Sequence, residues 1–326
     1  MKNVSILVPE TAVIEAVADP HYMFKAVNQF LLAMGKEPLF NVQLVAINKE
    51  VKLENSLFTV HIDKQLKDVQ QTDLIFIPAI SGDMTTALGL NKELVPWIAE
   101  QYNKGAEVAS LCIGAFLLAS TGLLNGKKCS SHWNAANEFR QMFPLVELVD
   151  GSIITEENGI YSSGGANSYW NLLLYLVEKY TDRDTAILAS KYFAVDIDRK
   201  SQSAFMLFKA QKNHDDQLIL LAQEFIETNY ADKIAVDMLA GKFAIGRRSF
   251  ERRFKKATGN TVVEYMQRVK IEAAKRSFES SRKNINEVMF DVGYTDTKAF
   301  RTLFKKITGL TPIEYRNKYN KQPVLN

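Results

Sequence analysis

The sequence contains very little cysteine, and this excludes several classes of protein. Cys112 and Cys129 are its only cysteines among 326 residues, too few for a disulfide framework or a cysteine-rich metal site. Long apolar runs are also missing, since none approaches the roughly 18 residues that a membrane-spanning helix needs. We therefore expect a cytoplasmic protein with no metal, no cofactor and no membrane partner.

Glycine and proline are sparse as well, at 16 and 8 residues, while 47% of the chain is hydrophobic. This composition is typical of a globular chain with two ordinary domains. The net charge of +3 conceals an asymmetry, because residues 217–326 carry 21 Lys and Arg against 12 Asp and Glu, and the rest carry 19 against 25. A basic segment behind an acidic body indicates a polyanionic partner for that segment.

The basic segment contains an internal repeat at an offset of 50 residues. Nine of the sixteen residues at 250–265 recur at 300–315. In each copy an apolar stripe at helical spacing precedes a turn and a second helix with an apolar inner face. The expected stripes are Ile234, Met238 and Leu239 in the first copy and Ile285, Val288 and Met289 in the second. Turns are expected at 241–244 and at Gly293.

The second helix of each copy is expected to present a cationic outer face. Such a face suits a helix in the DNA major groove, where Arg and Lys reach phosphates and guanine edges. A plain helical bundle would explain the apolar stripes but not two basic faces. The uninterrupted helical stretch 262–278 would span about 25 Å and hold the helices near the ~34 Å spacing of successive major grooves. The predicted contacts with double-stranded DNA are Arg247, Arg248, Arg252, Lys255, Thr297, Lys298, Arg301, Thr302 and Lys305.

Residues 1–190 alternate short apolar runs with helical stretches. Buried parallel strands are expected at 4–8, 42–47, 74–77 and 108–111, and helices at 20–34, 92–104, 113–121 and 167–179. The alternation predicts a doubly wound α/β domain with a parallel sheet, whose ligands bind at the carboxyl ends of the strands. We expect this domain over 1–190, a connection over 191–216, and an all-α domain of two helix-turn-helix units over 217–321.

Cys112 is expected at a strand-to-helix turn at one of these carboxyl ends. Backbone N–H groups at such an elbow lower a thiol pKa, and His132 and Glu15 would complete a catalytic set of thiol, imidazole and carboxylate. Spacing alone favours the alternative of a small buried cysteine, a structural histidine and a surface carboxylate. The ligand pocket is expected to include Glu15, Ser81, Cys112, Ile113, His132, Gly164 and Gly165.

Two segments resemble known families. INEVMFDVGYTDTKAFRTLFKKITGLTPIEYR, at 285–316, resembles the C-terminal signature of the AraC/XylS family, although Lys270 stands where that family often carries Arg. ASLCIGAFLLASTGLLNGKKCSSHW, at 109–133, resembles the ThiJ/PfpI superfamily of flavodoxin-like relatives of class I glutamine amidotransferases. The second resemblance implies that Cys112, His132 and Glu15 occupy that family's thiol, histidine and acidic positions in a sensing or dimerisation domain that has lost hydrolase activity.

The leading interpretation is a sequence-specific transcription regulator, not an enzyme. Its N-terminal domain would sense a small-molecule effector and form a homodimer, and its tail would bind DNA. A cysteine-dependent amidase-like or glyoxalase-like enzyme and a redox sensor acting through Cys112 stay open as alternatives. Both alternatives need an accessible thiolate at Cys112.

Overall fold

The computed structural model describes residues 1–197, 201–203, 208, 210–212 and 214–320. The chain divides into two compact units, Met1–Gln202 and Ser203–Asn326. Several residues of the expected connection 191–216, namely 198–200, 204–207, 209 and 213, lie outside the described residues, as does residue 321. No helix in the described ranges is long and apolar enough to cross a membrane.

Seven strands form a sheet through the middle of the first unit. They follow the order β10-β11-β7-β6-β1-β2-β5, and each neighbouring pair is parallel except β10 with β11. Their bounds are β1 Lys2–Leu7, β2 Phe40–Ala46, β5 Lys64–Gln65, β6 Leu74–Ile77, β7 Glu107–Ser110, β10 Ile154–Glu157 and β11 Ile160–Ser163. The predicted doubly wound parallel sheet is confirmed, with the flavodoxin-like order along β2, β1, β6, β7 and β11.

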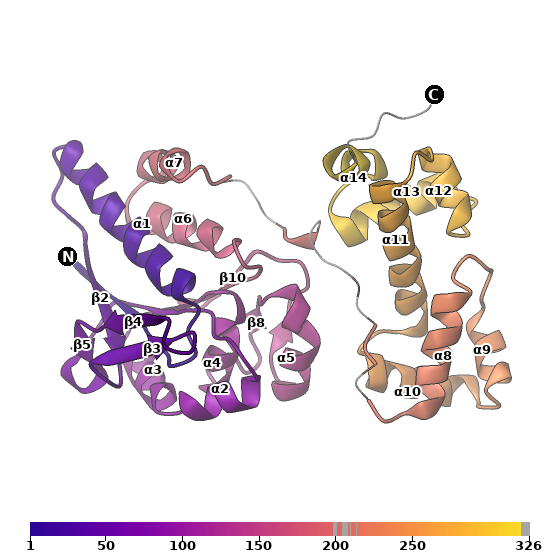
Figure 1. Ribbon diagram of the computed structural model, residues 1–326, viewed down its shortest axis with the longest axis horizontal. Coiled ribbons are helices and arrows are strands. Elements are labelled where there is room, and N and C mark those ends of the chain that lie inside the picture. The colour runs from indigo at the N-terminus through magenta and orange to yellow at the C-terminus, as the bar shows by residue number, and fades with distance from the viewer. Residues whose placement is uncertain (198–200, 204–207, 209, 213, 321–326) are drawn as a thin grey trace. The chain divides into compact units, whose positions relative to one another are not determined.

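Helices cover both faces of this sheet (Figure 1). One face packs against α1 (Ile14–Ala33), α6 (Tyr169–Tyr180) and α7 (Arg183–Tyr192). The other packs against α2 (Met84–Leu90), α3 (Leu94–Asn103), α4 (Ala115–Ser120) and α5 (Ala136–Met142). Because both faces are covered, β6 is buried along its whole length. The expected helix 20–34 was wrong at its start, since α1 begins at Ile14 and keeps the buried Pro20 inside it.

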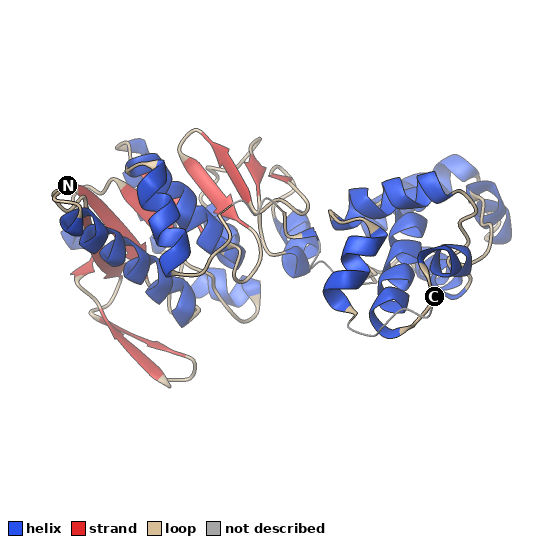
Figure 2. Ribbon diagram, turned by 90° about the horizontal axis from the view of Figure 1, so that it is seen from above, coloured by secondary structure: helices blue, strands red, loops and turns tan. Residues whose placement is uncertain are grey.

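Short elements complete the first unit. Two antiparallel strands, β3 (Glu50–Leu53) and β4 (Phe58–His61), form a hairpin, and β8 (Lys128–Cys129) pairs with β9 (Glu147–Leu148). Short 3-10 helices lie at η1 (Leu66–Asp68), η2 (Cys112–Gly114) and η3 (Trp133–Ala135). Figure 2 shows that every strand of the described residues lies in the first unit, whereas the second unit is helical.

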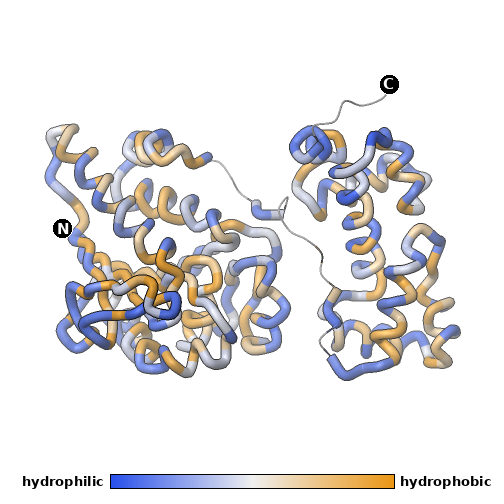
Figure 3. The backbone as a smooth tube through the Cα atoms, viewed as in Figure 1, coloured by the Kyte–Doolittle hydropathy of each residue, from blue (hydrophilic) through white to orange (hydrophobic). Residues whose placement is uncertain are grey.

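The second unit is built from two small groups of helices that share one long helix, α11 (Val262–Ser280). One apolar core forms around α8 (Gln217–Thr228), α9 (Val236–Lys242), α10 (Arg247–Thr258) and the start of α11. The other forms around the end of α11 with α12 (Ile285–Asp291), α13 (Thr297–Thr308) and α14 (Pro312–Tyr319). Figure 3 shows hydrophobic and hydrophilic residues alternating along these helices, as amphipathic packing requires.

The structure corrects one expected apolar stripe. Val236, Leu239 and Ala240 are buried in α9, whereas Met238 is 43% exposed. The expected pattern was wrong at Met238 because the buried stripe of α9 runs through Val236, Leu239 and Ala240 at i, i+3 and i+4 spacing, and Met238 lies outside that stripe. In the second copy Val288 and Met289 are buried and Ile285 is half-buried.

Candidate functional site

The helix α10 is the first of two basic helices in the second unit. Its inner face is fixed by Phe250 and Phe254, which are fully buried, and it ends at Gly259 in the left-handed conformation with φ 70°. Because these aromatic side chains fix which face points inward, Arg248 and Arg252 are exposed on the outer face.

Arg247, the first residue of α10, is exposed but already contacts two carboxylates. Its Nη1 atom lies 2.9 Å from Oδ2 of Asp237 in α9, and its Nε atom lies 3.2 Å from Oε1 of Glu251. Hydrogen bonding to Glu251 and the charge of Asp237 raise the pKa of the guanidinium group. This arginine is therefore held in one orientation on the surface.

The helix α13 is the second basic helix. The Asp296 carboxylate accepts hydrogen bonds from the backbone N–H groups of Lys298 at 2.8 Å and Ala299 at 3.0 Å. It thereby caps the N-terminus of α13, where these N–H groups have no partner within the helix. Phe300 and Phe304 are fully buried. The outer face consequently exposes four of the predicted contacts, Lys298, Arg301, Thr302 and Lys305, while Thr297 is half-buried.

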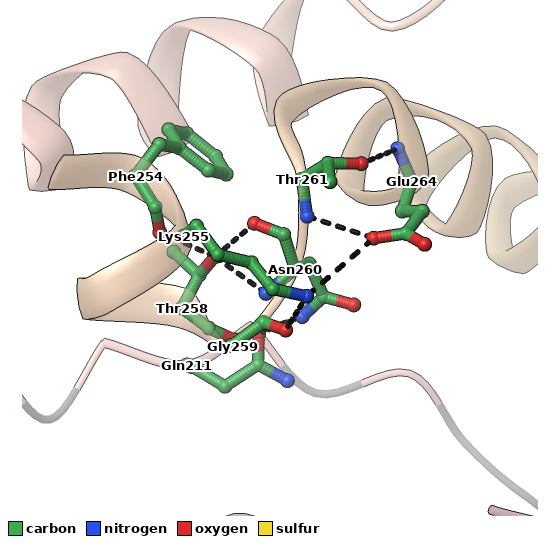
Figure 4. Close-up of polar contacts among 8 residues, drawn as sticks. All are labelled: Gln211, Phe254, Lys255, Thr258, Gly259, Asn260, Thr261 and Glu264. Atoms are coloured by element: carbon green, nitrogen blue, oxygen red, sulfur yellow. Dashed lines mark hydrogen bonds and ion pairs between the residues drawn. The ribbon is translucent and has the colours of Figure 1, made fainter. Parts of the chain in front are cut away.

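A tight turn joins α10 to α11 and engages one of the predicted DNA contacts (Figure 4). Thr261 and Glu264 form a reciprocal capping box at the start of α11. The Nζ atom of Lys255 donates to the Gly259 carbonyl oxygen at 2.7 Å and lies 3.9 Å from Glu264 Oε2. Lys255 is exposed, but its ammonium group is bound to this turn.

Lys270 in α11 connects the two halves of the second unit. Its Nζ atom donates to the Asp232 carbonyl oxygen at 3.3 Å and to the Val292 carbonyl oxygen at 3.1 Å. Burial lowers the pKa of its ammonium group. The turn is tight here, because a Cβ atom on Gly293 would lie 2.0 Å from the Ala231 carbonyl oxygen. The residue that departs from the AraC-family pattern thus bridges the loop after α8 and the turn after α12.

In the first unit, the parallel strands bring several expected pocket residues to one edge of the sheet. Glu15, Ser81, Cys112 and Gly164 follow β1, β6, β7 and β11, which are neighbours in the sheet and run in one direction. The carboxyl ends of such strands form the usual ligand-binding edge of this fold. The described residues contain no group of three His, Cys, Asp or Glu side chains that would hold a metal ion.

Cys112 lies at a strained turn between β7 and α4. Its φ is 56°, and its neighbour Gly114 approaches the Pro78 carbonyl oxygen so closely that a Cβ atom would lie 2.4 Å from it. Cys112 is only 5% exposed. Burial raises the pKa of its thiol to about 12, against a smaller lowering by the Ile113 N–H group. The thiol is therefore protonated at neutral pH.

The other two members of the expected catalytic set have separate surroundings. The Nδ1 atom of His132 accepts a hydrogen bond from the Asn134 N–H group at 3.1 Å, and its ring centroid lies 5.4 Å from that of Trp133. Burial lowers the pKa of His132. Within the described ranges, no hydrogen bond or ion pair joins Cys112 to His132 or Glu15. Ser81 is exposed, and its hydroxyl donates to the Thr11 carbonyl oxygen at 3.1 Å.

Sequence reasoning missed two residues beside Glu15. The Tyr169 hydroxyl donates to Asp19 Oδ2 at 2.6 Å. Burial raises the pKa of Asp19, and the Glu15 carboxylate adds to this effect. Burial and Asp19 raise the pKa of Tyr169, with smaller contributions from Cys112 and Glu15. Asp19 follows Glu15 by four residues on α1, so its position on the same helix face was readable from the sequence.

Gly164 and Gly165 pack against Gln202, the last residue of the first unit. A Cβ atom on Gly164 would lie 2.0 Å from Gln202 Nε2. That nitrogen donates to the carbonyl oxygens of Ser131 at 3.0 Å and Ser152 at 3.1 Å. Gln202 is 2% exposed, and its Oε1 atom has no hydrogen-bond partner among the described residues.

Hydrogen bonds link Gln202 to Cys112. The Ser131 hydroxyl donates to the Cys112 carbonyl oxygen at 3.3 Å, and the Cys112 N–H group donates to Ser163 Oγ at 3.3 Å. Ile113, the next residue, is half-buried. The structure thus brings together Cys112, Ile113, Gly164 and Gly165, whereas the described contacts of Ser81 and His132 lie with other residues.

Two protein families match separate parts of this chain. The DJ-1/PfpI family matches residues 24–179, and the family described as a helix-turn-helix domain matches residues 239–318. The first unit belongs to the DJ-1/PfpI family, and the second is an AraC-type helix-turn-helix domain. Both resemblances noted in the sequence are confirmed.

Named relatives are similar to this chain over different shares of its length. The HTH-type transcriptional regulator GbdR of Pseudomonas aeruginosa is 24% identical over 73% of this chain, and the match covers 65% of GbdR. The HTH-type transcriptional regulator GlxA of Rhizobium meliloti is 24% identical over 66% of each chain. The bifunctional transcriptional activator/DNA repair enzyme AdaA of Bacillus subtilis is 36% identical over 32% of this chain and 50% of AdaA. The chain thus spans just under two thirds of the length of GbdR.

Solved structures share the fold at low identity. A ThiJ/PfpI family protein from Pseudomonas syringae is 17% identical, covering 62% of this chain and 78% of that chain, with a TM-score of 0.51. A candidate transcriptional regulator from Vibrio parahaemolyticus is 22% identical, covering 59% of this chain and 98% of that chain, with a TM-score of 0.53. Both likenesses concern the fold alone.

Proposed function

We propose that the protein is a DNA-binding transcription regulator in which α10 and α13 enter successive major grooves. The observation that carries this proposal is the repetition, within one helix-turn-helix domain, of a basic helix backed by two buried phenylalanines. The proposed contacts with phosphates and bases are the exposed cations of the two helices together with Thr297 and Thr302. The similarity to proteins named as HTH-type transcriptional regulators supports the same function.

The architecture of the second unit suits this role. The 19 residues of α11 give an axis of about 28 Å, close to the ~34 Å between successive major grooves. The contacts of Lys270 with both halves favour a fixed spacing between α10 and α13. We propose that the DNA-binding domain covers 217–321, after a connection at 191–216.

The α/β domain, over 1–190 within the first unit, is proposed to sense a small molecule near Cys112 and to form a homodimer in the cytoplasm. A raised thiol pKa supports sensing over a cysteine-dependent enzyme or a redox sensor, because both of these need the thiolate. The Gln202 Oε1 atom has no hydrogen-bond partner among the residues that the structure describes, which supports a ligand that donates a hydrogen bond. Such a ligand would contact the residue at which the chain leaves the first unit.

Gln202 is well placed to couple the two units. A few residues further along the chain, the Phe208 N–H group donates to Glu272 Oε2 in α11 at 3.1 Å, and the Phe208 ring lies 5.2 Å from that of Tyr265. Gln202 and Phe208 are therefore each held by contacts within their own unit. A ligand can shift a protein between two conformations only if it binds them with different affinities. Contact with Gln202 would supply that difference in affinity.

The test is binding of the full-length protein to labelled DNA from upstream of its own coding sequence, titrated with salt against a scrambled fragment. We expect preferential binding to the natural fragment, with an affinity that falls as salt rises because phosphate contacts release counterions. Equal binding to both fragments at every salt concentration would contradict sequence-specific regulation. Once binding is measured, a metabolite library screened for changes in affinity tests the sensing role, with Gln202→Ala as the matched variant.

A further inference from the structure

Three charged residues form what we name the Arg247 clamp: Asp237, Arg247 and Glu251. Asp237 holds Nη1 of the arginine from α9, and Glu251 holds Nε from one turn further along α10. The Arg247 side chain is nevertheless 55% exposed. These contacts use the Nε hydrogen and one of the two Nη1 hydrogens. The other Nη1 hydrogen and both Nη2 hydrogens stay available to a partner.

The second copy of the repeat provides an internal comparison. The helices α10 and α13 begin 50 residues apart, and α9 and α12 begin 49 apart. Asn286 and Thr297 therefore stand where the first copy has Asp237 and Arg247, and Arg301 stands at the position of Glu251. Within the described ranges Arg301 forms no ion pair. In α10, Arg247 is thus held between two carboxylates, whereas in α13 no carboxylate of the described residues holds Arg301.

We propose that Asp237 and Glu251 hold Arg247 in the orientation that reads a guanine in the major groove. This inference rests on the proposed function. The free end of the guanidinium group matches the O6 and N7 acceptors of guanine, which arginine contacts in a bidentate manner. Holding the side chain before binding reduces the rotamer freedom that is lost on contact.

The carboxylates have a second consequence. The two negative charges beside the groove repel DNA phosphates whatever the base sequence, so they weaken binding to unrelated sequences. Asp237 and Glu251 are thus positioning residues that exchange general affinity for base selectivity. The first helix-turn-helix unit is, on this view, the more selective of the two, and Arg301 supplies affinity without such restraint.

The experiment is selection from a randomised double-stranded DNA library by the full-length protein, followed by sequencing of the bound fraction. The variants are Asp237→Asn, Glu251→Gln and the reference Arg247→Ala. Asp291→Asn is the matched control, because it neutralises another exposed carboxylate of the same domain, paired with Lys283 at 2.8 Å. Asp237, Arg247 and Asp291 are exposed and Glu251 is half-buried at the surface, so thermal unfolding should change little.

We expect Arg247→Ala to abolish a guanine preference at one motif position. Asp237→Asn and Glu251→Gln should reduce the preference at that same position by about tenfold, while they increase binding to unselected DNA. Asp291→Asn should leave the motif unchanged. A guanine preference that survives at full strength in Asp237→Asn and Glu251→Gln overturns the proposal, as does a loss spread evenly over all positions. A wild-type protein that selects no motif overturns the proposed function itself.

Discussion

Gln202 lies against Gly164 so closely that no side chain fits between them: a Cβ atom on the glycine would lie 2.0 Å from Gln202 Nε2 and 2.8 Å from the Ser131 carbonyl oxygen. From the sequence, Gly164 was expected to line the ligand pocket. Its function in this protein is to admit the amide of the residue at which the first unit ends.

Replacing Gly164 with alanine should therefore destabilise the first unit. The added methyl group must displace Gln202 or backbone, and we expect a loss of about 1–3 kcal/mol in the free energy of unfolding, measured by urea denaturation. Gly89→Ala is the matched control, because nothing lies within 4 Å of its Cβ position in α2. Alanine should stabilise that helix by about 0.5–1 kcal/mol. Equal effects of the two substitutions would argue against the tight contact with Gln202.

Replacing Arg301 with alanine tests the second basic helix. If this residue contacts a base, binding to the selected site should weaken by about 1–3 kcal/mol. If it contacts a phosphate, the loss should be uniform over sequences and the salt dependence shallower. Arg276→Ala removes the same charge from the exposed side of α11 and serves as the control. If the Arg301→Ala variant binds every DNA as the wild type does, the face of α13 proposed to enter the groove is the wrong one.

The state of Cys112 sets the expected thiol chemistry. Burial raises the pKa of Cys112 to about 12, and that of Cys129 to about 12 as well. The thiolate therefore forms only as pH rises toward that value, and iodoacetamide at about pH 8 should label both cysteines slowly and together in the native protein. Denatured protein should react rapidly. Selective rapid labelling of Cys112, or a loss of DNA binding after peroxide that Cys112→Ser prevents, would favour the enzyme or redox alternative instead.

Lys270→Met should loosen the spacing of the two basic helices. It keeps much of the side-chain volume but removes the donor to the Asp232 and Val292 carbonyl oxygens. We expect a loss of about 1 kcal/mol in the free energy of unfolding. We also expect greater tolerance of DNA sites in which one base pair is inserted between the two contacted segments. Lys270→Arg keeps the charge and the donors and should behave like wild type. Tolerance that is identical in all three proteins would show that α11 alone sets the spacing.

Much of the fold was readable because it depends on local patterns. Short apolar runs predicted β1, β2, β6 and β7, and the offset of 50 residues predicted two helix-turn-helix units. Met238 was misjudged because the expected stripe counted Ile234 as part of the helix, whereas the buried stripe of α9 runs through Val236, Leu239 and Ala240. A short apolar pattern allows more than one stripe, and packing against the core decides which one is buried.

The missed site contacts depend on segments far apart in the chain. Tyr169 donates to Asp19 across 150 residues, and Gln202 reaches the Ser131 carbonyl oxygen across 71. No spacing rule predicts such pairs, because the sheet topology brings them together. Even the contact of Arg247 with Asp237, only ten residues apart, depends on the turn between two helices rather than on the periodicity of either one.

The short stretch of chain between Gln202 and Phe208 also limits the distance between these two residues. From Gln202 to Phe208 the chain advances six residues, a reach of at most about 21 Å when fully extended. Covalent geometry alone therefore limits how far Phe208 can lie from Gln202. Two copies joined through their first units would hold their DNA-binding units at high local concentration. Inserting glycine and serine between Gln202 and Phe208 would then allow such a dimer to bind DNA half-sites over a wider range of spacings.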